Sequence, residues 1–348
     1  MNPRLKTGSE NAIRLCLSVQ PSDRVVIITD DETMEIGQAL QSVSQTITQS
    51  VMLIKIEDYI KRPAKELPYD FVQNIRNFNP TVSIYAAQGQ IGEIQVFRSP
   101  LVKFLTQELK CRHAHMIGVT GQLMEDGMNK DYARVFKVTN NVFNKVSNAT
   151  KLLVKDDYGT DITFILDPTN LKWIQDNGRI GKGEMRNLPA GEVFTSPLSA
   201  KGTIIAWELG DWMCKKYGEL KTPLKLDILN GLVFSVSPVN RNDSVAAEAS
   251  EIFSNYITEF ENGNRVGELG LGTLIGLTKF VGNLLQDEKF PGVHMALGHP
   301  YPEETGANWD SPSHIDVIAK STTVTVEHTD GTLEVIMRNG VYSTDILK

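Results

Sequence analysis

Hydrophobic runs alternate with helical patterns through about the first 120 residues of the chain. Four apolar runs have the length of buried strands: 24–29, 51–56, 81–87 and 115–120. Helices are predicted between them, over 33–43 and 93–109. Strands that alternate with helices indicate an α/β domain built on a doubly wound parallel sheet. An amphipathic helix over 130–148 follows, and we place the end of an N-terminal domain, 1–150, there.

The pattern changes after residue 150, where strand-like runs follow one another directly. A hairpin is predicted over 151–166, with D-D-Y-G-T as its turn. A helix is predicted from a cap at Asp243 or Ser244 to Asn262-Gly263, and a short helix over 274–285. Consecutive strands are typical of an antiparallel or mixed sheet, so we predict a C-terminal α+β domain, 151–348. Its other predicted strands are 192–196, 202–207, 232–236, 323–327 and 333–337.

Composition and charge narrow the class of protein. Hydrophobic residues make up 41% of the 348 residues, which is ample for the cores of two domains. The net charge of −7 disfavours nucleic acid as a partner, because phosphate binding needs a basic surface. Three scattered cysteines form no C-x-x-C pair, so neither a disulfide framework nor a cysteine zinc site is expected. The sequence has no signal-peptide pattern and no transmembrane run, and we expect a cytoplasmic protein without membrane contact.

Candidate metal ligands are concentrated in the stretch 265–316. Two of its candidates, His314 and Asp316, are two residues apart, so on a strand both side chains point the same way. Burying a carboxylate among apolar and glycine neighbours is costly unless a cation pairs with it. Three such carboxylates and two imidazoles would suit two divalent ions. The full candidate set is Glu192, Glu268, His294, Tyr301, His314 and Asp316.

Two other polar groups have simpler interpretations. Asp30 and Asp31 follow the first predicted strand, where a doubly wound sheet binds ligands, but helix capping explains them as well. No G-x-G-x-x-G follows that strand, so a dinucleotide fingerprint is absent from the sequence. His113 and His115 would share one face of a strand, as a metal pair or as ordinary structural residues.

Several sequence blocks resemble the thermophilic aminopeptidase family. They are G-E-V-F-T-S-P, G-E-L-G-L-G-T, D-E-K-F-P-G-V-H-M-A-L-G-H-P-Y and S-H-I-D, in the family's order, with G-T-D-I-T-F before them. The resemblance covers roughly 151–342, and the first half matches only in general style. The chain is shorter than the usual family peptidase, mostly in its N-terminal half.

The resemblance implies the roles of the candidate residues. The family's two metal-binding glutamates fall on Glu192 and Glu268, and its tyrosine falls on Tyr301. Its histidines and aspartate fall on His294, His314 and Asp316, so all six positions hold the expected residue type. The implied protein is a homodimeric metallo-aminopeptidase that acts on peptides through a water activated by two ions of Zn, Co or Mn. Glu192 or Glu268 would then move the proton and Tyr301 would stabilise the oxyanion.

Two alternatives remain open at this stage. The same fold has been reused by a hydroxypyridine ring-cleaving dioxygenase with one ferrous ion, and by a hydrolase of small aromatics. Two histidines and one carboxylate would suit Fe(II) and dioxygen, whereas retention of six ligands favours two ions. A binding protein without catalysis is the third class, and loss of metal binding would favour it.

Overall fold

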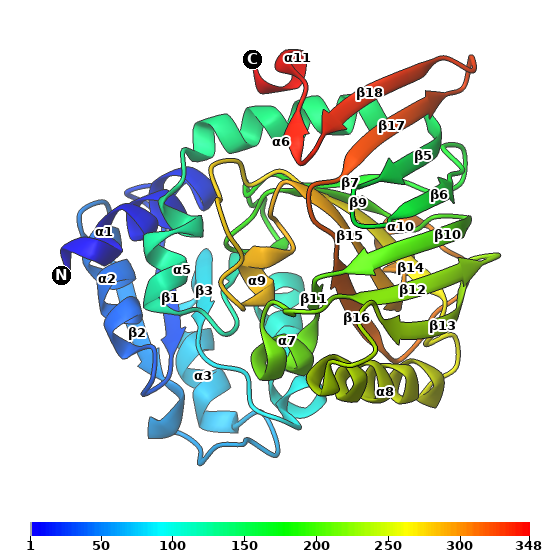
Figure 1. Cartoon of the computed structure of the whole chain (residues 1–348). Helices are drawn as coiled ribbons and strands as arrows, with labels where there is room; N and C mark the ends of the chain where they lie inside the picture. The colour runs from blue at the N-terminus through cyan, green and yellow to red at the C-terminus, as the bar shows by residue number, and fades with distance from the viewer. Residues whose placement is uncertain (1) are drawn as a thin grey trace. The chain divides into compact units, whose positions relative to one another are not determined.

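The computed structural model, which describes residues 2–348, divides the chain into two units (Figure 1). The first unit comprises Met1–Ala133 and Gly178–Ala190, and the second comprises Arg134–Asn177 and Gly191–Lys348. The division differs from the predicted 1–150 and 151–348. Residues 178–190 join the first unit because their strand β8 (Met185–Asn187) pairs with β4 (Arg112–His115).

The first unit contains a five-stranded parallel sheet in the order β2-β1-β3-β4-β8. Its central strand β1 (Val25–Thr29) lies between β2 (Val51–Lys55) and β3 (Val82–Ala86), and every residue of β1 and β3 is buried. The α-helices of this unit are α1 (Pro3–Glu10), α2 (Met34–Gln45), α3 (Tyr69–Phe78), α4 (Ser99–Lys103) and α5 (Gly121–Glu125). π-helical turns extend α1 through 11–16 and flank α4 at 94–98 and 104–108.

The second unit contains two antiparallel sheets. The eight-stranded sheet has the order β13-β12-β10-β6-β5-β17-β18-β19, and the six-stranded sheet has the order β11-β16-β15-β14-β9-β7. Strands of the larger sheet are β5 (Ala149–Lys155), β6 (Asp161–Ile165), β10 (Ser199–Ala206), β12 (Leu224–Leu229), β13 (Leu232–Pro238), β17 (Thr323–His328), β18 (Leu333–Arg338) and β19 (Val341–Tyr342). Strands of the smaller sheet are β7 (Ile174–Asp176), β9 (Glu192–Thr195), β11 (Glu208–Leu209), β14 (Val266–Gly272), β15 (Gly292–Gly298) and β16 (His314–Ile318).

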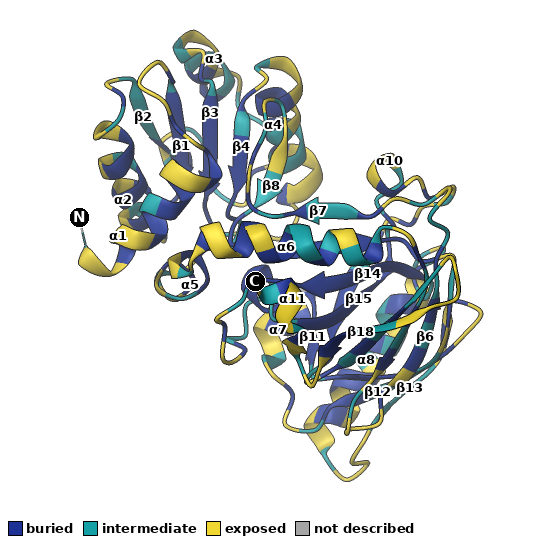
Figure 2. Cartoon of the chain, turned by 90° about the horizontal axis from the view of Figure 1, so that it is seen from above, coloured by how far each residue is buried: buried dark blue, intermediate teal, exposed yellow. Residues whose placement is uncertain are grey.

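One hydrophobic core joins the two sheets of the second unit. It includes Leu152 and Phe164 from the larger sheet, Leu269 and Val293 from the smaller sheet, and Phe253 from helix α8. All seven residues of β14 and of β15 are buried, and both strands are dark in Figure 2. The smaller sheet is therefore a rigid, water-excluded platform for polar side chains. The helices of this unit are α6 (Tyr132–Val146), α7 (Asp211–Tyr217), α8 (Ser244–Glu259), α9 (Leu284–Asp287), α10 (Pro302–Thr305) and α11 (Thr344–Leu347).

The predicted fold class is confirmed, with two local corrections. The strand predicted at 115–120 lies earlier, at Arg112–His115, because the chain turns at Gly118, whose φ is +69°. The helix predicted over 274–285 is a loop followed by the single turn α9. Gly276 and Gly282 have φ values of +92° and +71°, which a right-handed helix cannot hold.

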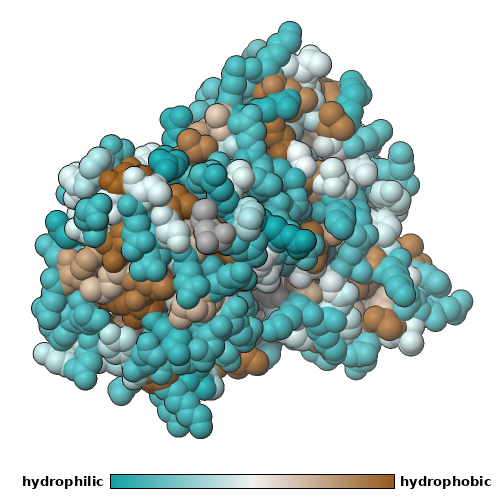
Figure 3. Space-filling view, turned by 90° about the vertical axis from the view of Figure 1, so that its left-hand side faces the viewer, coloured by the Kyte–Doolittle hydropathy of each residue, from teal (hydrophilic) through white to brown (hydrophobic). Residues whose placement is uncertain are grey.

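Hydrophilic side chains cover most of the face drawn in Figure 3, with hydrophobic side chains gathered in separate patches. Within residues 2–348, no helix is long and apolar enough to cross a membrane.

Candidate metal centre

The six predicted ligands converge in the second unit, mostly from one face of the six-stranded sheet. Strand register places Glu268 opposite Ala296 and Ala296 opposite Asp316, so these three positions form a row across three strands. His294 lies two residues before Ala296, and His314 lies two residues before Asp316. Both therefore share that face. The register places Glu192 opposite Gly272, four residues beyond Glu268 on β14.

Glycines beside the ligands leave the space that this crowding requires. A Cβ at Gly270, which is paired with His294, would lie 1.8 Å from the Nε2 atom of that histidine. A Cβ at Gly272 would lie 2.0 Å from the carbonyl oxygen of Phe290. The alternation of glycine with larger residues in G-E-L-G-L-G thus lets a side chain and a neighbouring backbone approach the strand.

A first group of ligand atoms surrounds the Nε2 atom of His294. That nitrogen lies 3.3 Å from Glu192 Oε2 and 3.4 Å from Glu268 Oε1, and the three atoms all lie within 4.8 Å of one another. Two ligands of a tetrahedral zinc ion lie about 3.4 Å apart when each is about 2.1 Å from the metal. His294 Nε2 therefore lies from each of the two carboxylate oxygens at the separation of ligands that share one ion.

A second group uses the other oxygen of the same glutamate. The Nε2 atom of His314 lies 3.7 Å from Glu268 Oε2 and 3.6 Å from Asp316 Oδ2. The Nδ1 atom of His314 lies 3.0 Å from the carbonyl oxygen of His299, which it reaches as a donor, leaving Nε2 free to bind a cation. Glu268 therefore lies between the two histidines, with one oxygen directed to each.

Tyr301 borders the second group. Its ring lies 5.1 Å from the ring of His314 and 5.6 Å from the ring of Phe194, between centroids. Its backbone has a left-handed φ of +53° at the start of α10. Burial, together with Glu268 and Asp316, raises the pKa of the Tyr301 phenol well above its ordinary value, so the isolated chain keeps this phenol protonated.

The electrostatics of the cluster favour a cation. Burial lowers the pKa of His294, but hydrogen bonding to Glu192 and Glu268 raises it well above the ordinary value. Burial alone would lower the pKa of His314. The negative charges of Asp316 and Glu268 raise it, and the net change is an increase. A proton on each imidazole thus supplies positive charge between the carboxylates, and a metal ion would bind the same nitrogens. The donor set fits a divalent cation, since imidazoles and carboxylates are its usual protein ligands.

Sequence reasoning missed two charged residues in the centre, Glu288 and Lys289. The Lys289 side chain is fully buried, and its ammonium lies 3.0 Å from Glu192 Oε1 and also pairs with Glu288. Both residues lie inside the block D-E-K-F-P-G-V-H, but a charged pair before a strand is ordinarily solvated. The 289–290 backbone lies close to Gly272, which brings Lys289 against the strand.

The His113–His115 pair, in the first unit, forms no comparable ligand group. Ser83 Oγ lies 2.8 Å from His113 Nδ1, and His113 Nε2 lies 3.3 Å from His115 Nδ1. Burial lowers the pKa of His113 to about 3, so this pair is neutral and hydrogen-bonded internally. Within residues 2–348, the group of three metal-binding side chains is Glu192, Glu268 and His294.

The two aspartates after β1 have structural partners. Asp30 accepts a hydrogen bond from the backbone amide of Thr33 at 2.9 Å. It also forms an ion pair with Arg62 at 2.7 Å. Asp31 pairs with Lys55 at 3.0 Å. The N-cap residue of α2 is Thr33, which makes no side-chain cap hydrogen bond, so Asp30 stabilises the turn before the helix and does not cap it.

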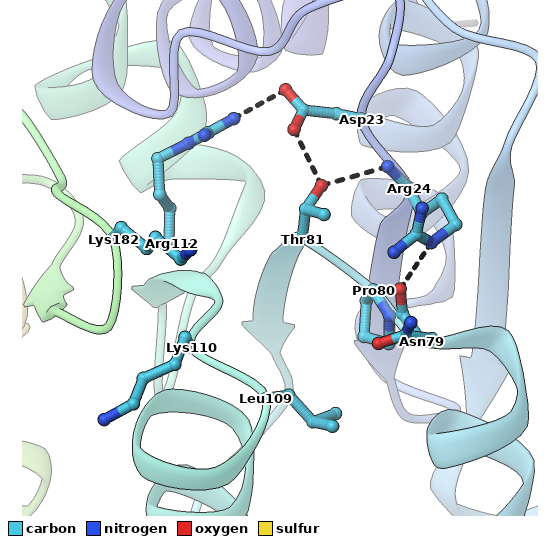
Figure 4. A pocket seen from close by; sticks show the side chains of 9 residues that line it. All are labelled: Asp23, Arg24, Asn79, Pro80, Thr81, Leu109, Lys110, Arg112 and Lys182. Carbon is cyan, nitrogen blue, oxygen red and sulfur yellow. Dashed lines mark hydrogen bonds and ion pairs between the residues drawn. The ribbon is translucent and has the colours of Figure 1, made fainter.

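A separate hollow of about 280 Å³ lies at the amino ends of the strands in the first unit (Figure 4). Its lining includes Arg24, Lys110, Arg112 and Lys182, and one carboxylate, Asp23. Arg112 is engaged by Asp23 at 2.6 Å, and Arg24 donates to the carbonyl oxygen of Asn79. None of the six predicted ligands lines this hollow. The cluster of predicted ligands is therefore the stronger candidate for a functional site.

Comparison with known proteins identifies a family and a fold. The sequence model of a family described as thermophilic metalloprotease (M29) matches residues 125–342, more than half of the chain and all six ligand positions. Wild-type AmpT from Thermus thermophilus superposes with a TM-score of 0.70 at 16% identity, covering 98% of this chain and 99% of that one. The 2,5-dihydroxypyridine dioxygenase from Pseudomonas putida KT2440 superposes with a TM-score of 0.69 at 14% identity, covering 100% and 99%. At these identities the two structures show a shared fold. No match was found among curated proteins.

Proposed function

We propose, from the premise that this chain belongs to the thermophilic metalloprotease (M29) family, that it is a metal-dependent aminopeptidase. One observation carries the proposal. Glu268 directs one carboxylate oxygen to His294 and the other to His314, while Glu192 and Asp316 complete the cluster. A divalent ion held there would polarise a scissile carbonyl and lower the pKa of a water molecule.

Three side chains of the cluster have separate roles in this proposal. Glu268, the residue between both histidines, takes the proton of the attacking water and returns it to the leaving amine. Tyr301 donates a hydrogen bond to the carbonyl oxygen of the substrate, which its protonated phenol can do. His314 is oriented for its role by the hydrogen bond to the His299 carbonyl.

The charge of the cluster also supports selection of a free N-terminus. The carboxylates of the cluster, which are the buried Glu192, Glu268 and Asp316 and the partly buried Glu288, outnumber the ammonium of Lys289. A protonated α-amine of a peptide is attracted to such a surplus of negative charge, whereas an acylated N-terminus is not.

A second candidate function rests on a subset of the same residues. His294, His314 and Asp316 supply two imidazoles and one carboxylate, the donor set typical of non-haem Fe(II) oxygenases. The likeness in fold to the dihydroxypyridine dioxygenase makes oxidative ring cleavage the competing chemistry.

The test compares free and blocked peptides on the purified full chain. We expect unblocked dipeptides to be hydrolysed after addition of Zn²⁺, Co²⁺ or Mn²⁺, and N-acetylated dipeptides to resist. Glu268→Gln should lower kcat/KM about 10²–10⁴-fold while the circular dichroism spectrum is unchanged. Oxygen consumption with dihydroxypyridines and Fe²⁺, without peptide hydrolysis, would replace the aminopeptidase with the dioxygenase.

A further inference from the structure

Lys289 is a buried cation inside the cluster of metal ligands. Its side chain is 0% exposed, and burial of an ammonium is costly unless carboxylates pair with it. Glu192 Oε1 lies 3.0 Å from its Nζ atom, and Glu288 pairs with the same ammonium. These two carboxylates compensate the buried ammonium.

The ammonium changes what Glu192 offers to a metal. One oxygen of this carboxylate contacts Lys289 and the other contacts His294 at 3.3 Å. An ion bound to the second oxygen would share one carboxylate with the ammonium, and like charges that are close together in a buried site repel strongly. The chain itself therefore places a cation on one oxygen of Glu192, a cation that Glu288 shares.

We propose that the Lys289 ammonium takes the place of one of two divalent cations, so that this chain binds a single metal ion. The remaining carboxylate ligands, Glu268 and Asp316, both face His314 and are left for a single divalent ion. With His294 and His314 they supply four donors, which are sufficient for one ion. The inference rests on the metal site proposed above and alters its expected stoichiometry.

The backbone supports a fixed position for this lysine. The amide of Leu274 donates to the Lys289 carbonyl at 3.0 Å, and the Lys289 amide donates to Gln286 at 2.9 Å. Gly272, which is paired with Glu192, admits the 289–290 backbone against β14. The segment that carries Lys289 therefore packs on β14, the strand paired with Glu192, and this contact fixes the ammonium beside that carboxylate.

The experiment counts metal ions on the purified full chain. Wild type and the double variant Glu288→Gln/Lys289→Gln are freed of metal with chelator and dialysed against Mn²⁺. The variant removes one charge of each sign and leaves Glu192 without its ammonium. Glu219→Gln/Lys320→Gln removes a Lys–Glu pair outside the cluster and serves as the matched control.

We expect one Mn²⁺ per wild-type chain with the electron paramagnetic resonance spectrum of an isolated ion. The Glu288→Gln/Lys289→Gln variant should bind a second ion at least about tenfold more tightly than wild type and show a spin-coupled pair. Two tightly bound ions in wild type would overturn the inference. A folded variant that still binds one ion would also overturn it, because Lys289 would then not limit the stoichiometry.

Failure here is distinguishable from failure of the proposed function. If the chain binds two ions and cleaves dipeptides, the proposed function stands and the inference on stoichiometry is wrong. If the chain binds one ion and cleaves no peptide, the inference on stoichiometry stands and the proposed aminopeptidase function is wrong.

Discussion

At the scale of single residues, the missing side chain at Gly270 leaves the space that the His294 ring occupies. Any Cβ there would lie 1.8 Å from His294 Nε2, far inside contact distance. The ring cannot stay where it is if that position gains a methyl group. Since Nε2 is the atom that faces Glu192 and Glu268, displacement of the ring separates the three ligand atoms.

We therefore expect Gly270→Ala to weaken metal binding at least about tenfold. Isothermal titration with Zn²⁺ measures the effect. Gly121→Ala is the control, because a Cβ at Gly121 meets no atom within 4 Å. Equal affinity of Gly270→Ala and wild type would show that His294 is not a ligand.

Glu208 is a buried carboxylate of the second unit that lies outside the set of candidate ligands. It is 0% exposed on β11, accepts a hydrogen bond from Cys214 Sγ at 2.7 Å, and is close to Asp287. Burial and the charge of Asp287 raise the pKa of Glu208 to about 8. Because the folded-state pKa lies above the unfolded value, the stability that this group contributes is present below about pH 4.5 and is lost as the pH rises toward 8.

Glu208→Gln, which mimics the neutral acid at every pH, should remove this loss. We expect the melting temperature of the variant to exceed that of wild type by a margin that grows between pH 5 and pH 8. Thermal unfolding at four pH values in that range checks it. Glu251→Gln, at an exposed position of α8, should leave the pH profile unchanged. A variant that is less stable than wild type at pH 8 would contradict the assignment.

The candidate ligands can be singled out in the sequence because each combines a potential metal-binding side chain with an apolar or glycine-rich setting. Such a setting has no solvent to stabilise a carboxylate, so Glu192 and Glu268 were candidates from the sequence alone. Glu288 and Lys289 were not, because adjacent opposite charges ordinarily remain in water. Lys289 is buried where its segment contacts another segment at Gly272, and no local pattern encodes that contact.

At the scale of elements, helix α8 shows a cap that the sequence predicted. The Asp243 carboxylate accepts hydrogen bonds from the amides of Val245 at 3.0 Å and Ala246 at 3.1 Å. The Thr222 hydroxyl donates to its other oxygen at 2.7 Å. The carboxylate thus satisfies two of the free N–H groups at the start of the helix and fixes the chain segment before it.

Asp243→Ala should therefore lower the melting temperature by about 2–4 °C. Differential scanning calorimetry measures the change, with Asn242→Ala, outside the cap, as the neighbouring control. Because α8 contributes Ala249 and Phe253 to the core but no predicted ligand, metal affinity should stay at the wild-type value. Equal melting temperatures for Asp243→Ala and wild type would mean that other contacts fix the helix start.

Strands with continuous apolar runs were predictable, and short strands were not. The first three strands of the parallel sheet and the 149–165 hairpin lie within a few residues of their predicted positions. Strand β8 consists of Met185, Arg186 and Asn187, which have no strand pattern. It exists because backbone groups at the edge of β4 pair with it. Tertiary pairing therefore decides such elements, not side-chain periodicity.

At the scale of the whole molecule, the chain crosses between units more often than the sequence suggested. Helix α6 begins at Tyr132 in the first unit and continues into the second. Residues 178–190 return to the first unit, where the Ile180 amide donates to the carbonyl oxygen of Cys16 at 3.1 Å. The change in the hydrophobic pattern along the sequence predicts one domain boundary. One boundary cannot describe a chain that returns to the first unit for residues 178–190. The homodimer implied by the family resemblance stays a prediction, which the mass in solution tests.

Metal binding should be visible in the stability of the whole protein. Without a metal ion, the Lys289 ammonium and protons on His294 and His314 offset the buried carboxylates of the cluster, which lack the solvent that stabilises them in the unfolded chain. A divalent ion binds the folded cluster far better than the dispersed residues of the unfolded chain. At a free concentration roughly one hundred times the dissociation constant it should add about 2.7 kcal/mol to the free energy of unfolding. Urea unfolding with Zn²⁺ and with chelator measures this difference, and Glu268→Gln, which removes the carboxylate between both histidines, should reduce it. Identical midpoints with and without the ion would mean that the folded cluster does not select a metal.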